Sequence, residues 1–238
     1  MVENQNLGIT WLGHATFVLT SPSGKRILID PYLTSNPSCP KGQKETNELD
    51  LILITHGHHD HLELDDLGAI SRATGAPIVS ILELAKWLES QGFANVHGMN
   101  KGGTQRVAGV DVTMVSASHS SSVQDPKDNH LVPVGEPVGY VIRFENGQTI
   151  YFAGDTDVFG DMTIIRRLYE PEIAFLPIGD HFTMAPRGAA LAVELLGVRT
   201  VVPMHYGTWP VLTGTPAELG KLLPAGVEML TLKPGETV

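Results

Sequence analysis

A short apolar run followed by four histidines constrains this chain more than any other feature of the sequence. Residues 51–54 are all Leu or Ile, and residues 55–61 directly after them read Thr-His-Gly-His-His-Asp-His. A buried strand that ends in several imidazoles is costly unless something satisfies their nitrogens, and a divalent metal ion does so. The different reaches of the His and Asp side chains suit two adjacent ions. A histidine-rich surface loop without a ligand is the alternative, but such loops seldom follow so apolar a strand.

Three later apolar runs each stop just before one side chain that can bind a metal. Residues 112–115 precede His119, residues 149–152 precede Asp155, and residues 200–204 precede His205. In each case small or turn-forming residues adjoin the polar group. One strand end of this kind would mean little, whereas four in one short chain predict a shared metal site.

The order of these groups resembles the metallo-β-lactamase superfamily over essentially the whole chain. HxHxDH comes first, followed by a lone His, then Gly-Asp-Thr, and then another lone His. Flanking segments resemble a branch of uncharacterised metal-dependent hydrolases related to the ascorbate-6-phosphate lactonases and, more distantly, to N-acyl-phosphatidylethanolamine phospholipase D. These segments are WLGHATF at 11–17, LIDPYL at 28–33 and PMHYGT at 203–208.

The resemblance implies seven metal ligands. The first ion would be held by His56, His58 and His119, the second by Asp60, His61 and His205, and Asp155 would bridge the two. These donors are nitrogen and oxygen without a thiolate, a set that leaves the metal open among zinc, manganese, nickel and iron. We favour zinc, followed by manganese, which the resemblance to the lactonases implies. A bound divalent ion can lower the pKa of water to about 7, which supplies hydroxide at neutral pH.

The sequence therefore predicts a hydrolase with two divalent ions that acts on a small ester, lactone or phosphate ester. We favour a lactonase or esterase over a phosphodiesterase, because the chain is acidic and lacks a phosphate-binding loop. Its net charge is −10 and its basic residues are scattered, which argues against a nuclease and against nucleic acid as a partner. A flavodiiron-like redox protein is the remaining alternative, but such proteins replace one imidazole of the first motif, and His58 is intact.

Three further residues lie near the expected ligands in the sequence. Asp30 ends an apolar strand and could hold a ligating histidine, or simply cap the turn before proline. His14 could support a ligand, line the pocket or be structural. His59 lies inside the motif, but its spacing directs it away from the metals.

Two further groups could act on the substrate. Asp60 is a candidate catalytic residue as well as a ligand. His181 follows another apolar strand and could contact the substrate or donate a proton, or else pack beneath its loop. Tyr206, with Thr208 and Trp209 after it, could form the pocket wall.

The apolar periodicity predicts one mixed α and β domain spanning residues 1–238. Strands are expected near 8–12, 16–20, 26–30, 51–54, 77–79, 95–98, 104–108, 110–117, 138–153 (a hairpin), 173–178, 200–204 and 228–232. Helices are expected near 62–74, 82–88, 161–169, 187–196 and 215–223. Residues 120–137 are expected to form an irregular loop, as a lid or an oligomer contact. The resemblance refines this to a four-layer αββα sandwich.

The remaining composition bears on location and partners. The N-terminus shows no signal peptide, and no apolar run reaches the roughly 20 residues of a membrane span, so no membrane partner is expected. A single cysteine, Cys39, excludes an intramolecular disulfide framework and suits a cytoplasmic location. Relatives commonly assemble, so a homo-oligomer is expected by analogy.

Overall fold

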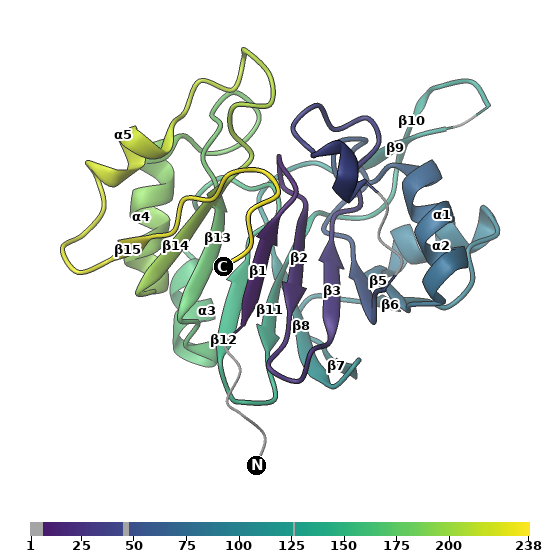
Figure 1. Ribbon diagram of the computed structural model, residues 1–238, viewed down its shortest axis with the longest axis horizontal. Helices are drawn as coiled ribbons and strands as arrows, with labels where there is room; N and C mark the ends of the chain where they lie inside the picture. Colours follow the sequence, from purple (N-terminus) through teal and green to yellow (C-terminus); the bar gives the residue numbers. More distant parts are fainter. Residues whose placement is uncertain (1–6, 45–47, 126) are drawn as a thin grey trace.

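Two β-sheets pack face to face, and helices cover the outer face of each, which gives four layers (Figure 1). The structure is a computed structural model that describes residues 7–44, 48–125 and 127–238. The αββα architecture implied by the resemblance is confirmed. The prediction that the chain begins without a signal peptide falls on residues 1–6, outside the described residues.

The first sheet contains six strands from the N-terminal part of the chain. In spatial order they are β1 (Gly8–Trp11), β2 (Phe17–Thr20), β3 (Arg26–Ile29), β4 (Leu51–Leu53), β5 (Ile78–Ile81) and β6 (Val96–Met99). The strands β1 to β3 pair antiparallel, and β3 to β6 pair parallel. Parallel neighbours need crossover connections: α1 (Leu64–Thr74) joins β4 to β5, and α2 (Leu82–Ser90) joins β5 to β6.

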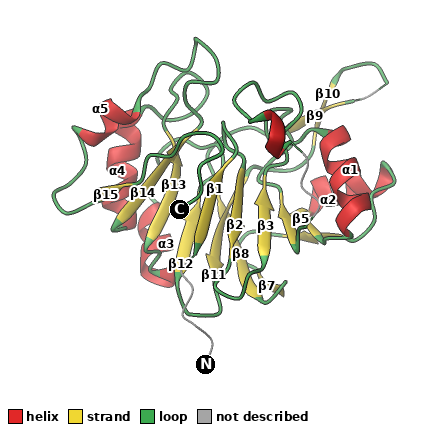
Figure 2. Ribbon diagram, in the orientation of Figure 1, coloured by secondary structure: helices red, strands yellow, loops and turns green. Residues whose placement is uncertain are grey.

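The second sheet contains seven strands from the C-terminal part of the chain. In spatial order they are β15 (Glu228–Met229), β14 (Thr200–Met204), β13 (Ile173–Pro177), β12 (Thr149–Phe152), β11 (Val138–Arg143), β8 (Val110–Ser116) and β7 (Thr104–Val107). The strands β12 to β15 are parallel, and the others pair antiparallel. The connecting helices are α3 (Met162–Tyr169), α4 (Pro186–Leu196) and α5 (Pro216–Gly220) (Figure 2).

Aromatic side chains join the two sheets in the middle of the core. The ring of Phe17 on β2 packs edge-on against Phe152 on β12 and Phe175 on β13, with ring centroids 5.8 and 5.1 Å apart. The hydroxyl of Tyr140 on β11 donates a hydrogen bond to the carbonyl of Ile54, just after β4, at 2.7 Å. This buried bond ties the second sheet to the strand that leads into the histidine motif.

Three segments differ from the expectation. Residues 120–137 contain a small hairpin of β9 (Ser122–Gln124) and β10 (Leu131–Pro133). Each hairpin strand has three residues, and only Val123 is buried, which leaves no alternating pattern to detect. The helix α5 and the strand β15 end earlier than expected, at Gly220 and Met229.

Within the described part of the chain, no helix combines the length and the apolar character needed to cross a bilayer. The two longest helices, α1 and α4, have 11 residues each.

Candidate metal centre

The histidine motif occupies a tight loop at the end of β4, whose three residues are fully buried. The loop turns on itself through bonds from the backbone N–H groups of His61 and Leu62 to the carbonyl of His58, at 3.0 and 2.8 Å. Gly57 lies directly beneath the β9–β10 hairpin: a Cβ there would come within 2.7 Å of a methyl of Val134. The motif therefore needs glycine at this position for the hairpin to pack onto it.

One cluster of imidazoles matches the first predicted ion. His56, His58 and His119 place ring nitrogens within 4.8 Å of one another. The Nε2 of His56 and the Nδ1 of His58 are 3.0 Å apart. Burial lowers the pKa of all three imidazoles, with nearby imidazoles adding to the shift, so the neutral forms that bind metals are favoured.

A second cluster adjoins the first. It consists of His14, Asp60, His61 and His205. Burial alone would raise the pKa of Asp60, but the hydrogen bond from His14 and the nearby imidazoles of His205 and His61 lower it well below the ordinary value, so the carboxylate is ionised.

Asp155 lies between the two clusters, in the position expected of a bridging ligand. Its Oδ1 is 3.2 Å from Nε2 of His61, and its Oδ2 is 3.1 Å from Nε2 of His205. The same Oδ2 is 3.6 Å from Nε2 of His119 and 3.9 Å from Nε2 of His56. One carboxylate thus faces imidazoles from both clusters, and all seven residues expected to bind metal are brought together at one edge of the sandwich.

The buried polar atoms of this site fit a cation. Among the described residues, the buried atoms without a hydrogen-bond partner include Nε2 of His61, Oδ1 of Asp155 and both ring nitrogens of His205. Leaving such a group unsatisfied costs about 1–3 kcal/mol. Divalent ions held here would satisfy Nε2 of His61, Oδ1 of Asp155 and Nε2 of His205. Imidazole and carboxylate are suitable donors for zinc or manganese.

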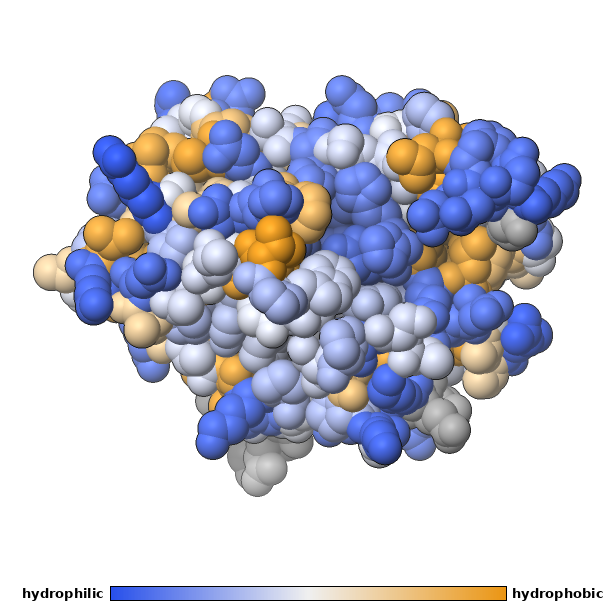
Figure 3. Space-filling view, turned by 90° about the horizontal axis from the view of Figure 1, so that it is seen from above, coloured by the Kyte–Doolittle hydropathy of each residue, from blue (hydrophilic) through white to orange (hydrophobic). Residues whose placement is uncertain are grey.

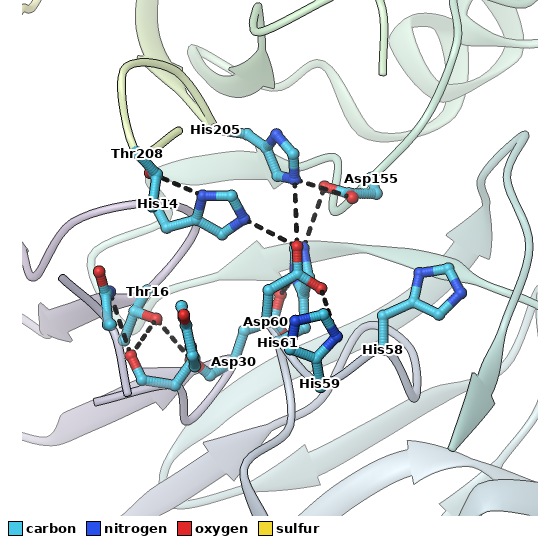
Figure 4. Close-up of polar contacts among 12 residues, drawn as sticks. His14, Thr16, Asp30, His58, His59, Asp60, His61, Asp155, His205 and Thr208 are labelled. Atoms are coloured by element: carbon cyan, nitrogen blue, oxygen red, sulfur yellow. Dashed lines mark hydrogen bonds and ion pairs between the residues drawn. The ribbon is translucent and has the colours of Figure 1, made fainter. Parts of the chain in front are cut away.

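Asp30 supports the second cluster from below (Figure 4). Its Oδ2 lies 2.7 Å from Nδ1 of His61, and both residues are fully buried. This contact directs Nε2 of the same ring towards Asp155. Burial raises the pKa of Asp30, although His61 and Thr55 offset part of the shift. Burial likewise disfavours the cation of His61, but Asp155 and Asp30 outweigh this and hold its pKa well above the ordinary value.

His14 contacts Asp60 rather than filling space in the pocket. Its Nε2 is 3.1 Å from Oδ2 of Asp60, and its Nδ1 is 2.8 Å from the hydroxyl of Thr208. Burial and the neighbouring His205 lower the pKa of His14 to about 4, so the ring is neutral. The neutral ring accepts a hydrogen bond from Thr208 at Nδ1 and donates one to Asp60 from Nε2. The second bond orients the Asp60 carboxylate.

The other candidate residues lie outside the two clusters. The side chain of His59 is 68% exposed, and Trp209 packs against both this ring and that of His14. Tyr206 stacks on Trp11 with ring centroids 5.2 Å apart. His181 follows β13 at the same edge but is exposed, and its ring packs edge-on to that of Phe182. In the view from above, a group of hydrophilic side chains lies just right of the middle of this face, and an apolar group lies directly to its left (Figure 3).

Two supporting residues had no place in the sequence-based site. Thr55, the first residue of the motif, bonds to both Asp30 and His56. Gly179 lies so close to the backbone of His205 that a Cβ there would be 2.1 Å from the carbonyl oxygen. The position of Thr55 between the apolar run and the first histidine was visible in the sequence, whereas the Gly179 contact joins segments that only the fold brings together.

Comparisons with known proteins agree with this geometry. The β-lactamase superfamily domain matches residues 25–206. A UPF0173 metal-dependent hydrolase of Koribacter versatilis is 50% identical over 236 residues, with 99% of each chain covered. Another, from Rubrobacter xylanophilus, is 51% identical over 231 residues, which cover 96% of this chain and 94% of the relative.

A solved structure shows the same fold at appreciable sequence identity. Igni18, described as a novel metallo hydrolase of the hyperthermophilic archaeon Ignicoccus hospitalis, superposes with a TM-score of 0.81 and 36% identity. The match covers 98% of this chain and 97% of Igni18. Together with the profile match and the two relatives, this shows that the chain belongs to the UPF0173 metal-dependent hydrolases of the β-lactamase superfamily.

Proposed function

We propose that this protein is a dinuclear hydrolase that cleaves a small ester, lactone or phosphate ester. The observation that carries the proposal is the convergence of seven buried or half-buried His and Asp side chains, several with unsatisfied atoms facing one another. Two divalent ions, which we expect to be zinc, would supply Lewis acidity and lower the pKa of bound water to about 7.

The residues of the chain would divide the remaining work among them. The first cluster and the second cluster would each hold one ion, with Asp155 between them. Asp60, ionised and held by His14, is placed to accept a proton at Oδ1, the oxygen that His14 does not engage. His181, which is exposed and follows β13, is the candidate proton donor to the leaving group.

A cavity beside the motif supports a small substrate. It measures about 650 Å³ and lies between the β9–β10 hairpin and the start of α1. Gly57 and His59 of the motif belong to its lining. Four lining residues are carboxylates and one is a lysine; the carboxylates are Glu63, Asp65, Asp125 and Asp128. This charge favours an uncharged ester or lactone over a phosphodiester, since like charges repel.

The test combines metal analysis with a substrate panel. The purified protein is expected to contain two divalent ions per chain and to hydrolyse uncharged lactones or carboxylic esters faster than matched phosphodiesters. Asp155→Ala should lose both metal and turnover. Full activity of this variant, or of chelator-treated protein, would overturn the proposal, and faster turnover of phosphodiesters would replace the esterase with a phosphodiesterase.

The expected homo-oligomer is tested separately. Sedimentation velocity of the purified protein should give a mass that is a multiple of 25.7 kDa. A single species at 25.7 kDa over a wide concentration range would refute this expectation.

A further inference from the structure

Thr55 lies between the end of β4 and the first histidine of the motif and is fully buried. Its backbone N–H donates to Oδ1 of Asp30 at 2.8 Å. Its hydroxyl donates to Oδ2 of the same carboxylate, also at 2.8 Å. The hydroxyl oxygen is in addition 3.0 Å from Nδ1 of His56. One hydroxyl therefore connects a buried carboxylate to a candidate ligand of the first ion.

The single hydroxyl hydrogen determines the direction of this chain of bonds. The Thr55 hydroxyl donates this hydrogen to Oδ2 of Asp30. The lone pair of Thr55 then accepts a hydrogen bond from the Nδ1–H of His56. This leaves Nε2 of His56 without a proton, on the side of the ring that faces Nδ1 of His58 and Oδ2 of Asp155. Coordination of a metal through Nε2 requires this tautomer.

Asp30 also contacts His61, in this case without an intervening residue: its Oδ2 lies 2.7 Å from Nδ1 of His61. The two histidines belong to different clusters: His56 is part of the first and His61 of the second. One carboxylate thus reaches an imidazole of each cluster, one by direct contact and the other by way of Thr55. The turn that carries Asp30 is itself held, because the hydroxyl of Thr16 donates to the Asp30 carbonyl at 2.8 Å.

We propose that Thr55 is a positioning residue whose hydroxyl holds His56 in the Nδ1–H tautomer and, through Asp30, links the supports of the two metal sites. The expected change in metal affinity rests on the proposed function, whereas the tautomer of His56 does not. Removal of the Thr55 hydroxyl should weaken metal binding at the first site. At the second site, the direct contact between Asp30 and His61 remains.

The surroundings of Thr55 allow the hydroxyl to be tested apart from its shape. Its Cβ and methyl group pack so closely on Gly154 that a Cβ there would come within 2.9 and 3.1 Å of them. Its carbonyl accepts from the N–H of Val138 at 3.0 Å. Thr55→Val keeps the branched shape and removes the hydroxyl, whereas Thr55→Ser keeps the hydroxyl and removes the methyl group.

The experiment uses the whole protein and two readouts. Nitrogen-15 NMR of the imidazoles in metal-free protein reports the tautomer of His56, and competition with a chelator reports zinc affinity at each site. Thr55→Val should lose the Nδ1–H signature and weaken the first site by about 10–100-fold, as supporting contacts to ligands typically do. Thr55→Ser should resemble the wild type in both. Thr113→Val, which removes a buried hydroxyl bonded to Thr104 on the distant edge, is the matched control.

Several results would overturn the inference. An unchanged tautomer and affinity in Thr55→Val would show that the hydroxyl does not position His56. Equal losses in the Val and Ser variants would assign the effect to methyl packing. If Thr55→Val does not fold, Thr55→Ser still decides, because a lost tautomer in a protein that keeps the hydroxyl contradicts the proposal. A wild type that shows the tautomer but binds no metal would refute the proposed function and leave the role of Thr55 standing.

Discussion

Gly179→Ala should disturb the second metal site without touching any ligand side chain. Gly179 follows β13, and a Cβ built on it would lie 2.1 Å from the carbonyl oxygen of His205. The carbonyl would have to move by at least about 0.9 Å to restore even a 3.0 Å contact. The backbone of Gly179 lies outside the left-handed region, so alanine adds bulk without adding backbone strain.

The cost can be estimated from that displacement. Overpacking of this size typically destabilises a fold by about 1–3 kcal/mol. A shift of about 1 Å in a group that positions the reaction can lower the rate by about 100-fold. We therefore expect Gly179→Ala to remain folded, to bind the second metal more weakly and to lose most of its turnover.

The assay compares metal content, zinc affinity and thermal stability of Gly179→Ala with those of Gly160→Ala. At Gly160 a Cβ meets no atom within 4 Å, so that variant should match the wild type. Wild-type metal affinity and turnover in a folded Gly179→Ala protein would refute the claim that the backbone at this position holds His205 in place.

Three other predictions concern separate parts of the molecule. His181→Ala should keep both metals and lose turnover, measured by metal analysis and steady-state kinetics, because the residue is exposed and belongs to neither cluster. Burial opposes the cation of His205, but Asp155 raises its pKa to about 9, so the metal-free ring is protonated at neutral pH. Binding must release that proton, and zinc affinity measured by chelator competition should rise with pH up to about 9, by about tenfold per pH unit for each proton released. Tyr140→Phe should cost about 1 kcal/mol of unfolding free energy in a denaturant titration, because it removes the bond to Ile54.

Each of these has a distinct contrary result. Loss of metal from His181→Ala would make that residue a ligand or its support. A zinc affinity independent of pH would show that the metal-free site holds no displaceable proton. For the tyrosine, Tyr151→Phe is the matched control, since its buried hydroxyl has no partner and its removal should cost little. Equal destabilisation by the two substitutions would contradict the role given to the Tyr140 bond.

The sequence could predict which side chains gather at the site because each of them follows a buried strand. Apolar runs such as 51–54 and 200–204 are fully or almost fully buried, and parallel strands end at one edge of a sheet. The spacing of His56, His58 and Asp60 then separates the ligands from the exposed His59. The information is local in each case, and the fold needs only to bring the strand ends together.

The sequence named Asp30 and His14 as possible supports, but the partners of these residues could not be predicted in the same way. The bond between Asp30 and His61 joins residues 31 positions apart, and that between His14 and Thr208 joins residues 194 apart. Such pairs have no periodic signature, because they depend on which strands become neighbours. The β9–β10 hairpin was missed for a related reason: its strands of three residues carry no alternating apolar pattern, and its contact with Gly57 joins segments that are distant in the sequence.

Anomalous X-ray diffraction from crystals grown with zinc or manganese tests the central claim most directly. The account predicts two peaks about 3.5–4 Å apart, the usual spacing of two-metal sites. One should lie among the imidazoles of His56, His58 and His119, and the other between Asp60, His61 and His205, with Asp155 contacting both. A cluster without anomalous density at saturating metal, or with a single ion that leaves one set of ligands unused, would contradict the account.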